Sequence, residues 1–307
     1  MKPQLLALIH LSEESKAAIG SAFDIIYAPT AEKRAAAIAG AAKEVRVVLT
    51  NGSTGLTATE MDTLDKLELV CALGAGYENI DGAHAATRGI KIATGAGTND
   101  DCVADHAMGL VLAIMRNIRQ LDLACRGGIW REALALPPQL AGKRLGVAGL
   151  GTIGKKIARR AAAFDMEIGY FNRSRRDDVD YAYFDNAEQL AAWCDVLVIA
   201  TPGGAATRHL VGARELRALG PKGFLVNIAR GSVVDTAALA AALDKGELGG
   251  AGLDVYESEP QPPRELLEFK NVVLTPHMAG WSPEAITASV TKFLRNTEAH
   301  FAAVGGK

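Results

Sequence analysis

The chain has 307 residues, of which 49% are hydrophobic and 22% are charged, and its formal net charge at pH 7 is −2. This length suggests about two domains, each large enough to bury a core. The near-neutral charge argues against nucleic acid as the main partner, and no apolar run approaches the ~18 residues of a membrane span. The apolar run at residues 5–9 is too short for a signal peptide and continues into a predicted strand.

The cysteines are scattered along the chain and show no C-x-x-C spacing. This pattern indicates reduced, mostly buried thiols of a cytoplasmic protein rather than a disulfide framework or a zinc site, so no metal is expected. They are Cys71, Cys102, Cys125 and Cys194.

Strands and helices alternate over the first 98 residues, which predicts a parallel sheet covered by helices on both faces. Thr57 with Glu60 resembles a capping box for the third helix. The strand-like runs are residues 5–9, 23–27, 45–50, 69–73 and 90–93, and the helical runs are residues 13–22, 31–42, 59–66 and 82–88.

Two loops of this segment, residues 51–55 and 74–81, follow predicted strands. Ligands of such sheets bind beyond the carboxyl ends of the strands. The backbone amides of Ala75 and Gly76 could bind an anion, because small residues allow close approach. The alternative is a tight turn capped by Asn79 or Asp81, and spacing does not separate the two.

Residues 101–126 show one long helical pattern that carries the chain to the next domain and ends at Gly127-Gly128. The following segment, residues 129–140, is irregular and apolar and contains Trp130. Such a composition is unusual for a solvent loop and indicates contact with another surface. Packing onto its own chain is the alternative.

Residues 143–176 form a predicted βαβ unit around Gly149-Leu150-Gly151-Thr152-Ile153-Gly154. An apolar strand precedes this G-x-G-x-x-G turn, and a helix and a second strand follow it, as in dinucleotide-binding proteins. Gly149 would make the tight turn, Gly151 would admit a pyrophosphate, and Gly154 would let helix and strand pack closely. The alternative is a glycine-rich turn of some other α/β protein.

Asn172 occupies the end of the second strand, where an acidic residue usually binds the ribose of NAD. Arg173, Ser174 and Arg175 follow it. Nothing there repels a 2′-phosphate, and two guanidinium groups could hold one, so we expect an NADP(H) site. The alternative is an exposed basic loop.

Four later runs, residues 196–200, 223–227, 250–254 and 272–274, read as buried strands, and Asp235 and Gly246 would start and stop a helix between them. Each later strand ends in polar residues. Singly, Arg230 could be a surface ion-pair partner, Glu259 a solvated carboxylate and His277 a structural histidine. Because all follow strand ends at one sheet edge, we expect them to meet the substrate there. The residues at these ends are Thr201, Pro202, Arg230, Asp254, Glu257, Glu259 and His277.

With these motifs in order, nearly the whole chain resembles the D-2-hydroxyacid dehydrogenase family, most closely its glyoxylate/hydroxypyruvate reductase branch. The resemblance implies an α/β fold of two doubly wound parallel-sheet domains, with a Rossmann cofactor domain inserted in a flavodoxin-like substrate domain. The motifs that carry it are residues 74–81, 149–154, 227–231, 252–260 and 275–280.

The resemblance implies three catalytic residues. Arg230 would bind the substrate carboxylate and polarise its 2-oxo group, His277 would be the acid/base, and Glu259 would pair with His277. The amides of Ala75 and Gly76 would hold the carboxylate.

The resemblance also implies cofactor contacts. Asp254 and the Ile228 carbonyl would hold the nicotinamide carboxamide, and Thr207 would lie on the phosphate side. Asn172 departs from the usual aspartate, which fits NADPH. The whole expected set is Val103, Gly149, Leu150, Gly151, Thr152, Ile153, Gly154, Asn172, Arg173, Ser174, Arg175, Thr201, Pro202, Thr207, Ile228, Asp254 and Gly280.

The last helix, residues 284–304, begins after Ser282-Pro283 and is expected to return the chain to the first domain. The expected substrate domain is therefore residues 1–98 with 278–307, and the NADP-binding domain is residues 99–277. Trp281 would form part of the wall of the substrate pocket.

These observations predict a cytoplasmic, homodimeric reductase of a small 2-oxo acid that prefers NADP(H) and can use NAD(H). It would have no nucleic-acid or membrane partner. A larger oxo acid such as 2-ketogluconate or an aryl pyruvate is the first alternative substrate. A non-catalytic nucleotide sensor on the same fold is the second alternative.

Overall fold

The structure is a computed structural model that describes residues 2–41 and 44–305. Its internal contacts divide the chain into two compact units, which are Met1–Asn99 with Gly280–Lys307, and Asp100–Ala279. The second unit is therefore inserted into the sequence of the first. Each unit is built on one parallel β-sheet, as the fold class predicted from the sequence requires.

The first unit contains a five-stranded parallel sheet with the order β2-β1-β3-β4-β5, which is the flavodoxin-like order. Leu6 pairs with Val48, Val48 with Val70 and Val70 with Ile92, so one apolar row crosses the sheet. The strands are β1 Gln4–Ala7, β2 Asp24–Tyr27, β3 Val45–Thr50, β4 Leu69–Ala72 and β5 Lys91–Thr94.

Helices cover both faces of this sheet, and two apolar cores result. Val290 and Phe293 of the C-terminal helix pack into one core, so this helix completes the first unit. The capping box of Thr57 and Glu60 is confirmed. Residue 42 of the expected helix 31–42 lies outside the described residues. The helices are α1 Glu13–Gly20, α2 Ala31–Ala36 with a π-helical turn Ala37–Ala41, α3 Ala58–Asp62, α4 Gly82–Thr87 and α11 Pro283–Gly305.

The second unit contains a seven-stranded parallel sheet with the order β12-β11-β10-β9-β6-β7-β8. Counted within the unit, the first six strands follow the Rossmann order 3-2-1-4-5-6. The three-residue edge strand β8 was missed from the sequence. The strands are β6 Arg144–Ala148, β7 Glu167–Phe171, β8 Ala182–Phe184, β9 Val196–Ile199, β10 Phe224–Asn227, β11 Gly250–Leu253 and β12 Val272–Leu274.

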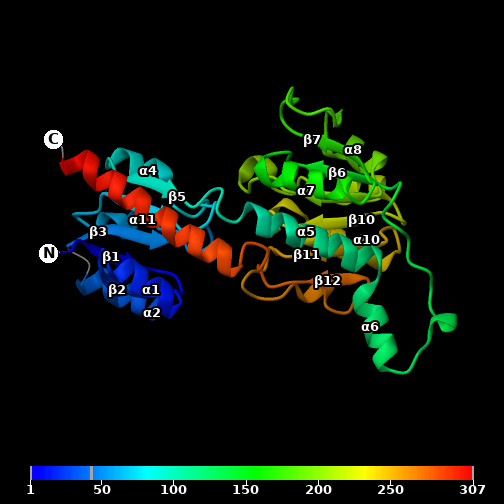
Figure 1. The fold of residues 1–307 in the computed structure, drawn as a ribbon, viewed down its shortest axis with the longest axis horizontal. Coiled ribbons are helices and arrows are strands. Elements are labelled where there is room, and N and C mark those ends of the chain that lie inside the picture. Colours follow the sequence, from blue (N-terminus) through cyan, green and yellow to red (C-terminus); the bar gives the residue numbers. More distant parts are fainter. Residues whose placement is uncertain (1, 42–43, 306–307) are drawn as a thin grey trace. The chain divides into compact units, whose positions relative to one another are not determined.

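The helices of this unit cover both faces of its sheet (Figure 1). The predicted helix start at Asp235 is confirmed, since its side chain accepts a hydrogen bond from the Ala238 amide, and Gly246 follows with φ 66°. The helices are α5 Asp100–Met115, α6 Ile118–Arg126, α7 Thr152–Ala162, α8 Ala187–Trp193, α9 Ala213–Leu219 and α10 Thr236–Asp244, with short 3₁₀ turns Arg131–Ala133, Ala205–Thr207, Gly231–Val233 and Arg264–Leu266.

The single helix predicted for residues 101–126 is wrong, because the chain breaks between α5 and α6. Asn117 adopts the left-handed conformation with φ 52°, which asparagine tolerates better than most residues. The apolar face of α5 packs against β11 and α7, whereas α6 has no buried residue. Figure 1 shows α6 extending away from the sheet of its unit.

The apolar segment after α6 does not pack onto its own chain through its largest side chains. Trp130 is 67% exposed and Leu136 is 94% exposed. Of the two interpretations of residues 129–140, packing onto the same chain is therefore wrong for these side chains.

The cysteines carry no disulfide in the structure. Burial raises the pKa of Cys71 and that of Cys194 to about 12, which makes both thiols inert, whereas Cys125 is exposed on α6. No helix within residues 2–41 and 44–305 combines the length and the apolar character needed to cross a membrane.

Candidate active site

The glycine-rich turn joins β6 to α7, as the sequence predicted. Gly149 has φ 100°, and a Cβ on it would lie 2.7 Å from the carbonyl carbon of Ala200. A Cβ on Gly154 would lie 2.2 Å from the Gly149 oxygen. The packing of β6, β9 and α7 therefore requires both glycines.

Gly151 differs, because the protein's own packing does not require a glycine there. A Cβ on Gly151 would meet nothing within 4 Å, so the space beside it is open. The N-terminus of α7 begins at the next residue, and its amide groups favour an anion. The buried Thr201 hydroxyl at the end of β9 has no hydrogen-bond partner among the described residues. An open cradle and an unsatisfied donor at this edge fit the phosphates of a dinucleotide.

Asn172 follows β7 and stabilises the same turn. Its Oδ1 accepts a hydrogen bond of 2.7 Å from the Leu150 amide. Arg173, Ser174 and Arg175 come next and are exposed. Within the described parts of the chain, neither Arg173 nor Arg175 forms an ion pair with another side chain, and the roles predicted for both remain predictions.

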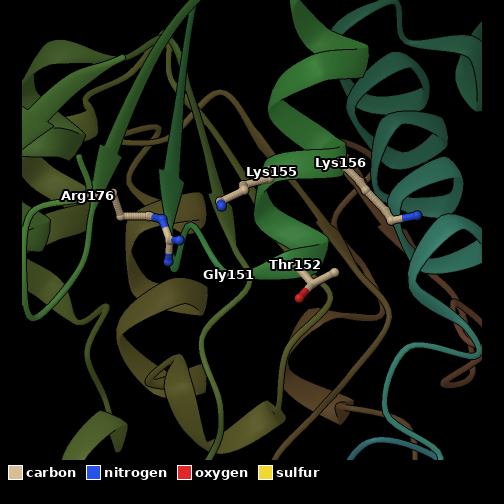
Figure 2. Close-up of a pocket in the computed structure, with 5 residues that line it drawn as sticks. All are labelled: Gly151, Thr152, Lys155, Lys156 and Arg176. Atoms are coloured by element: carbon tan, nitrogen blue, oxygen red, sulfur yellow. The ribbon is translucent and has the colours of Figure 1, made fainter. Parts of the chain in front are cut away.

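A pocket lies at the start of α7 and is lined by Gly151, Thr152, Lys155, Lys156 and Arg176 (Figure 2). Gly151 and Thr152 were predicted as cofactor contacts, whereas the three basic residues were not. A signal existed in the sequence, since Arg176 continues the basic run after Asn172 and the lysines lie one turn into α7.

The structure brings His277 and Glu259 together. His277 follows β12, and its Nδ1 lies 2.8 Å from Oε2 of Glu259. The other carboxylate oxygen of Glu259 accepts a hydrogen bond of 2.9 Å from the Tyr256 amide. Burial alone would raise the pKa of Glu259, but the hydrogen bonds from His277 and Tyr256 and the charge of Arg230 bring this pKa below its usual range. Glu259 therefore stays ionised and orients the imidazole.

Asp254 holds the segment on both sides of His277, through the side chain of Thr275 and the backbone that follows. This fully buried carboxylate accepts hydrogen bonds from the Thr275 hydroxyl (2.6 Å) and from the amides of Met278 (2.8 Å) and Ala279 (2.8 Å). Burial would raise the pKa of Asp254, but hydrogen bonds, first from His106 and then from Thr275, lower it. The carboxamide contact predicted for Asp254 remains a prediction.

His106 of α5 reaches the same segment and was not predicted. Its Nε2 lies 2.9 Å from the Thr275 hydroxyl and 3.4 Å from Oδ1 of Asp254. His277 itself has φ 55°, a left-handed conformation that its neighbours must maintain. The contacts of Asp254 and His106 supply that constraint.

Arg230 follows β10 in a turn that Asn227 fixes. The buried Asn227 donates from Nδ2 to the Arg230 carbonyl (3.0 Å) and accepts from the Ala229 amide (3.0 Å). A Cβ on Gly203 would lie 2.7 Å from Cγ of Arg230, so the loop after β9 packs against the arginine side chain. The positive charge of Arg230 also lowers the pKa of Glu259.

The remaining predicted residues fall in two groups. Within the second unit, Val103 and Ile228 are buried and Ile153 is partly buried against the core. The Thr207 hydroxyl donates to the Pro202 carbonyl (2.8 Å). The others belong to the first unit, and their contacts with substrate or cofactor remain predictions. They are Ala75, Gly76, Gly280 and Trp281.

Comparisons with known proteins show which family the chain resembles. Residues 108–279 match the family model of the D-isomer specific 2-hydroxyacid dehydrogenase NAD-binding domain. Over 261 residues, the chain is 40% identical to the hydroxyphenylpyruvate reductase of Plectranthus scutellarioides, which covers 85% of this chain and 83% of that protein. It is also 40% identical over 261 residues to the 2-ketogluconate reductase of Gluconobacter oxydans. That alignment covers 85% of this chain and 84% of the reductase.

A solved structure agrees with this match. The NADPH-dependent glyoxylate/hydroxypyruvate reductase of Sinorhizobium meliloti, in complex with NADP and malonate, is 36% identical and has a TM-score of 0.91. The similarity covers 98% of this chain and 94% of that one.

Proposed function

The chain belongs to the D-isomer specific 2-hydroxyacid dehydrogenase family, and we propose that it reduces a small 2-oxo acid, glyoxylate or hydroxypyruvate, with NADPH. It is an NAD(P)-dependent oxidoreductase that acts on CH–OH groups. The observation that supports the proposal most strongly is the hydrogen-bonded pair of His277 and Glu259, in a sheet where Arg230 follows the end of β10 and His277 the end of β12.

The chemistry follows from these side chains. The nicotinamide, when bound, supplies the hydride that is added to C2 of the oxo acid. Charge then develops on the carbonyl oxygen, and a donor must deliver a proton to it. Because Glu259 binds Nδ1 of His277, the opposite nitrogen, Nε2, is the one that can deliver this proton. The fork of Arg230 suits a carboxylate beside a carbonyl, and its charge favours the developing oxyanion.

The function is tested by turnover with NADPH and a panel of oxo acids. Glyoxylate and hydroxypyruvate should give the highest kcat/KM, and 2-ketogluconate and 4-hydroxyphenylpyruvate are the alternative substrates in the panel. Because two similar proteins are named for those larger substrates, a larger oxo acid is the second candidate. Trp281 would line the substrate pocket in either case. Tight NADPH binding without turnover of any oxo acid would contradict the reductase and favour a nucleotide sensor.

NADPH should be preferred over NADH by at least about tenfold in kcat/KM, the ratio expected from one net charged contact. The proposal rests on Asn172 in place of an acid and on the exposed Arg173 and Arg175 beside it. The similar S. meliloti enzyme is NADPH-dependent, which supports this preference. NADH is the second cofactor proposed, since the matching family model is that of an NAD-binding domain.

This preference should reverse when Asn172 becomes aspartate and both arginines become neutral. It should also weaken with added salt, because the contact is ionic and near the surface. The measurement is kcat/KM for both cofactors at two ionic strengths. Equal use of the two by the wild type would mean that the basic loop only faces solvent.

The partner proposed for the exposed apolar segment is a second copy of the chain. Replacing both Trp130 and Leu136 with serine should shift a dimer toward the monomer, because solvent-exposed apolar side chains of this size mark protein contacts. Mass measured by light scattering tests this, with Leu267→Ser as the control for an exposed leucine elsewhere in the unit. A monomeric wild type would contradict the proposal.

A cytoplasmic location is also proposed, supported by the free thiols.

A further inference from the structure

Two basic side chains of the pocket at the start of α7 converge. In Figure 2, Lys155 of α7 points toward Arg176, whereas Lys156 points the other way, toward α5. Lys156 forms an ion pair of 2.6 Å with Asp101 of α5. Lys155 and Arg176 are therefore the two cations of this pocket whose side chains point toward each other.

A carboxylate of the chain itself holds these two cations. Nε and Nη2 of Arg176 donate to the two oxygens of Asp178, at 2.7 and 3.0 Å, and Lys155 donates to Oδ2 of Asp178. A guanidinium fork and an ammonium around one anion is also the arrangement that binds a phosphate monoester. Asp178 thus occupies the position in which an anionic ligand of the pocket would accept hydrogen bonds from Lys155 and Arg176.

The two sides of this cluster are not held equally. The buried hydroxyl of Tyr170 in β7 accepts a hydrogen bond of 2.8 Å from the Arg176 amide. Lys155 is fixed at its backbone by α7. Asp178 lies on an exposed loop outside any helix or strand. The backbone of each cation is therefore anchored, whereas the backbone of Asp178 belongs to no helix or strand.

We propose that Lys155 and Arg176 bind the 2′-phosphate of NADP(H), and that Asp178 is their built-in counter-ion, which the phosphate displaces. The inference rests on the proposed use of NADP(H) and extends the predicted contacts beyond Arg173 and Arg175. NAD(H) carries no 2′-phosphate and leaves the cluster intact. Asp178 therefore lowers the affinity for the phosphorylated cofactor alone and sets the degree of preference.

The test compares two cofactor fragments, adenosine 2′,5′-bisphosphate and adenosine 5′-monophosphate, by calorimetric titration of the full-length protein. Asp178→Asn should tighten the bisphosphate about three- to tenfold, because one competing exposed ion-pair partner is removed. Arg176→Gln should weaken it about tenfold or more, because the fork is lost. The affinity for the monophosphate should change by less than about twofold in both variants.

Asp177→Asn is the matched control, since Asp177 is the adjacent exposed acid and forms no ion pair with another described residue. It removes the same charge without breaking a bond to Lys155 or Arg176. The readout is the affinity for the bisphosphate divided by the affinity for the monophosphate, both measured on one preparation, so that a partly unfolded sample does not alter it. If this ratio in Asp178→Asn is equal to or lower than the ratio in Asp177→Asn, the role of Asp178 is overturned. An unchanged ratio in Arg176→Gln would overturn the phosphate site.

The outcome does not depend on catalysis. A protein that turns over no oxo acid can still show the predicted ratios, so the inference and the reductase can fail separately. A wild type that binds both fragments equally would remove the 2′-phosphate site while leaving an NADH-dependent reductase possible.

Discussion

Replacing His277 with alanine should lower kcat by about 10²–10⁴, the usual contribution of a positioned general acid, while leaving NADPH binding nearly intact. Nδ1 of His277 is bound by Glu259, and Asp254 holds the backbone that follows it. The imidazole is therefore fixed with one nitrogen left for the substrate. Steady-state kinetics and a fluorescence titration of NADPH measure the two effects.

The backbone of His277 makes a second variant useful. Because φ is 55°, alanine strains the chain, whereas asparagine tolerates this conformation. His277→Asn should therefore lose activity like His277→Ala while its unfolding temperature stays closer to that of the wild type.

His209→Ala is the matched control for both variants. His209 has φ 50° and pairs with Glu257 at 2.8 Å, and neither residue is among the predicted catalytic, cofactor-binding or substrate-binding residues. It should lose stability comparably and keep kcat within a few-fold of the wild type. If both His277 variants also kept kcat within a few-fold of the wild type, His277 would have no role in the mechanism.

The main features of the fold could be predicted because they follow from local patterns. Alternating strands and helices predict parallel sheets, and the carboxyl ends of parallel strands meet at one edge. The position of Arg230, Glu259 and His277 after strand ends of one sheet follows from these patterns. The pairing of Glu259 with His277 came from the family resemblance, and the structure gives its geometry.

The features that were missed depend on tertiary contacts. His106 lies 169 positions from Thr275 in the sequence, and no spacing connects them. The break of the long helix depends on the φ angle of a single residue, Asn117. In the basic run after β7, composition cannot distinguish the exposed Arg175 from Arg176, whose backbone the Tyr170 hydroxyl anchors.

Replacing Arg230 with lysine should lower kcat/KM by about 10²–10³, although the positive charge is kept, because removal of one oriented donor to a developing oxyanion has a cost of this size. A lysine offers a point charge and cannot form two parallel bonds to a carboxylate. The site is also shaped for arginine, since Asn227 fixes the turn and the loop at Gly203 packs against Cγ.

The balance between kcat and KM shows what Arg230 does. If it only anchors the carboxylate, Arg230→Lys should raise KM and spare kcat; if it also polarises the 2-oxo group, as we expect, both should worsen. Arg214→Lys is the control, because Arg214 is an exposed arginine that pairs with Glu188 outside the site. Its kinetics should match the wild type within about twofold, the scatter expected for a surface substitution. If Arg230→Lys behaves like this control, the carboxylate of the substrate is bound by other groups and Arg230 is not its clamp.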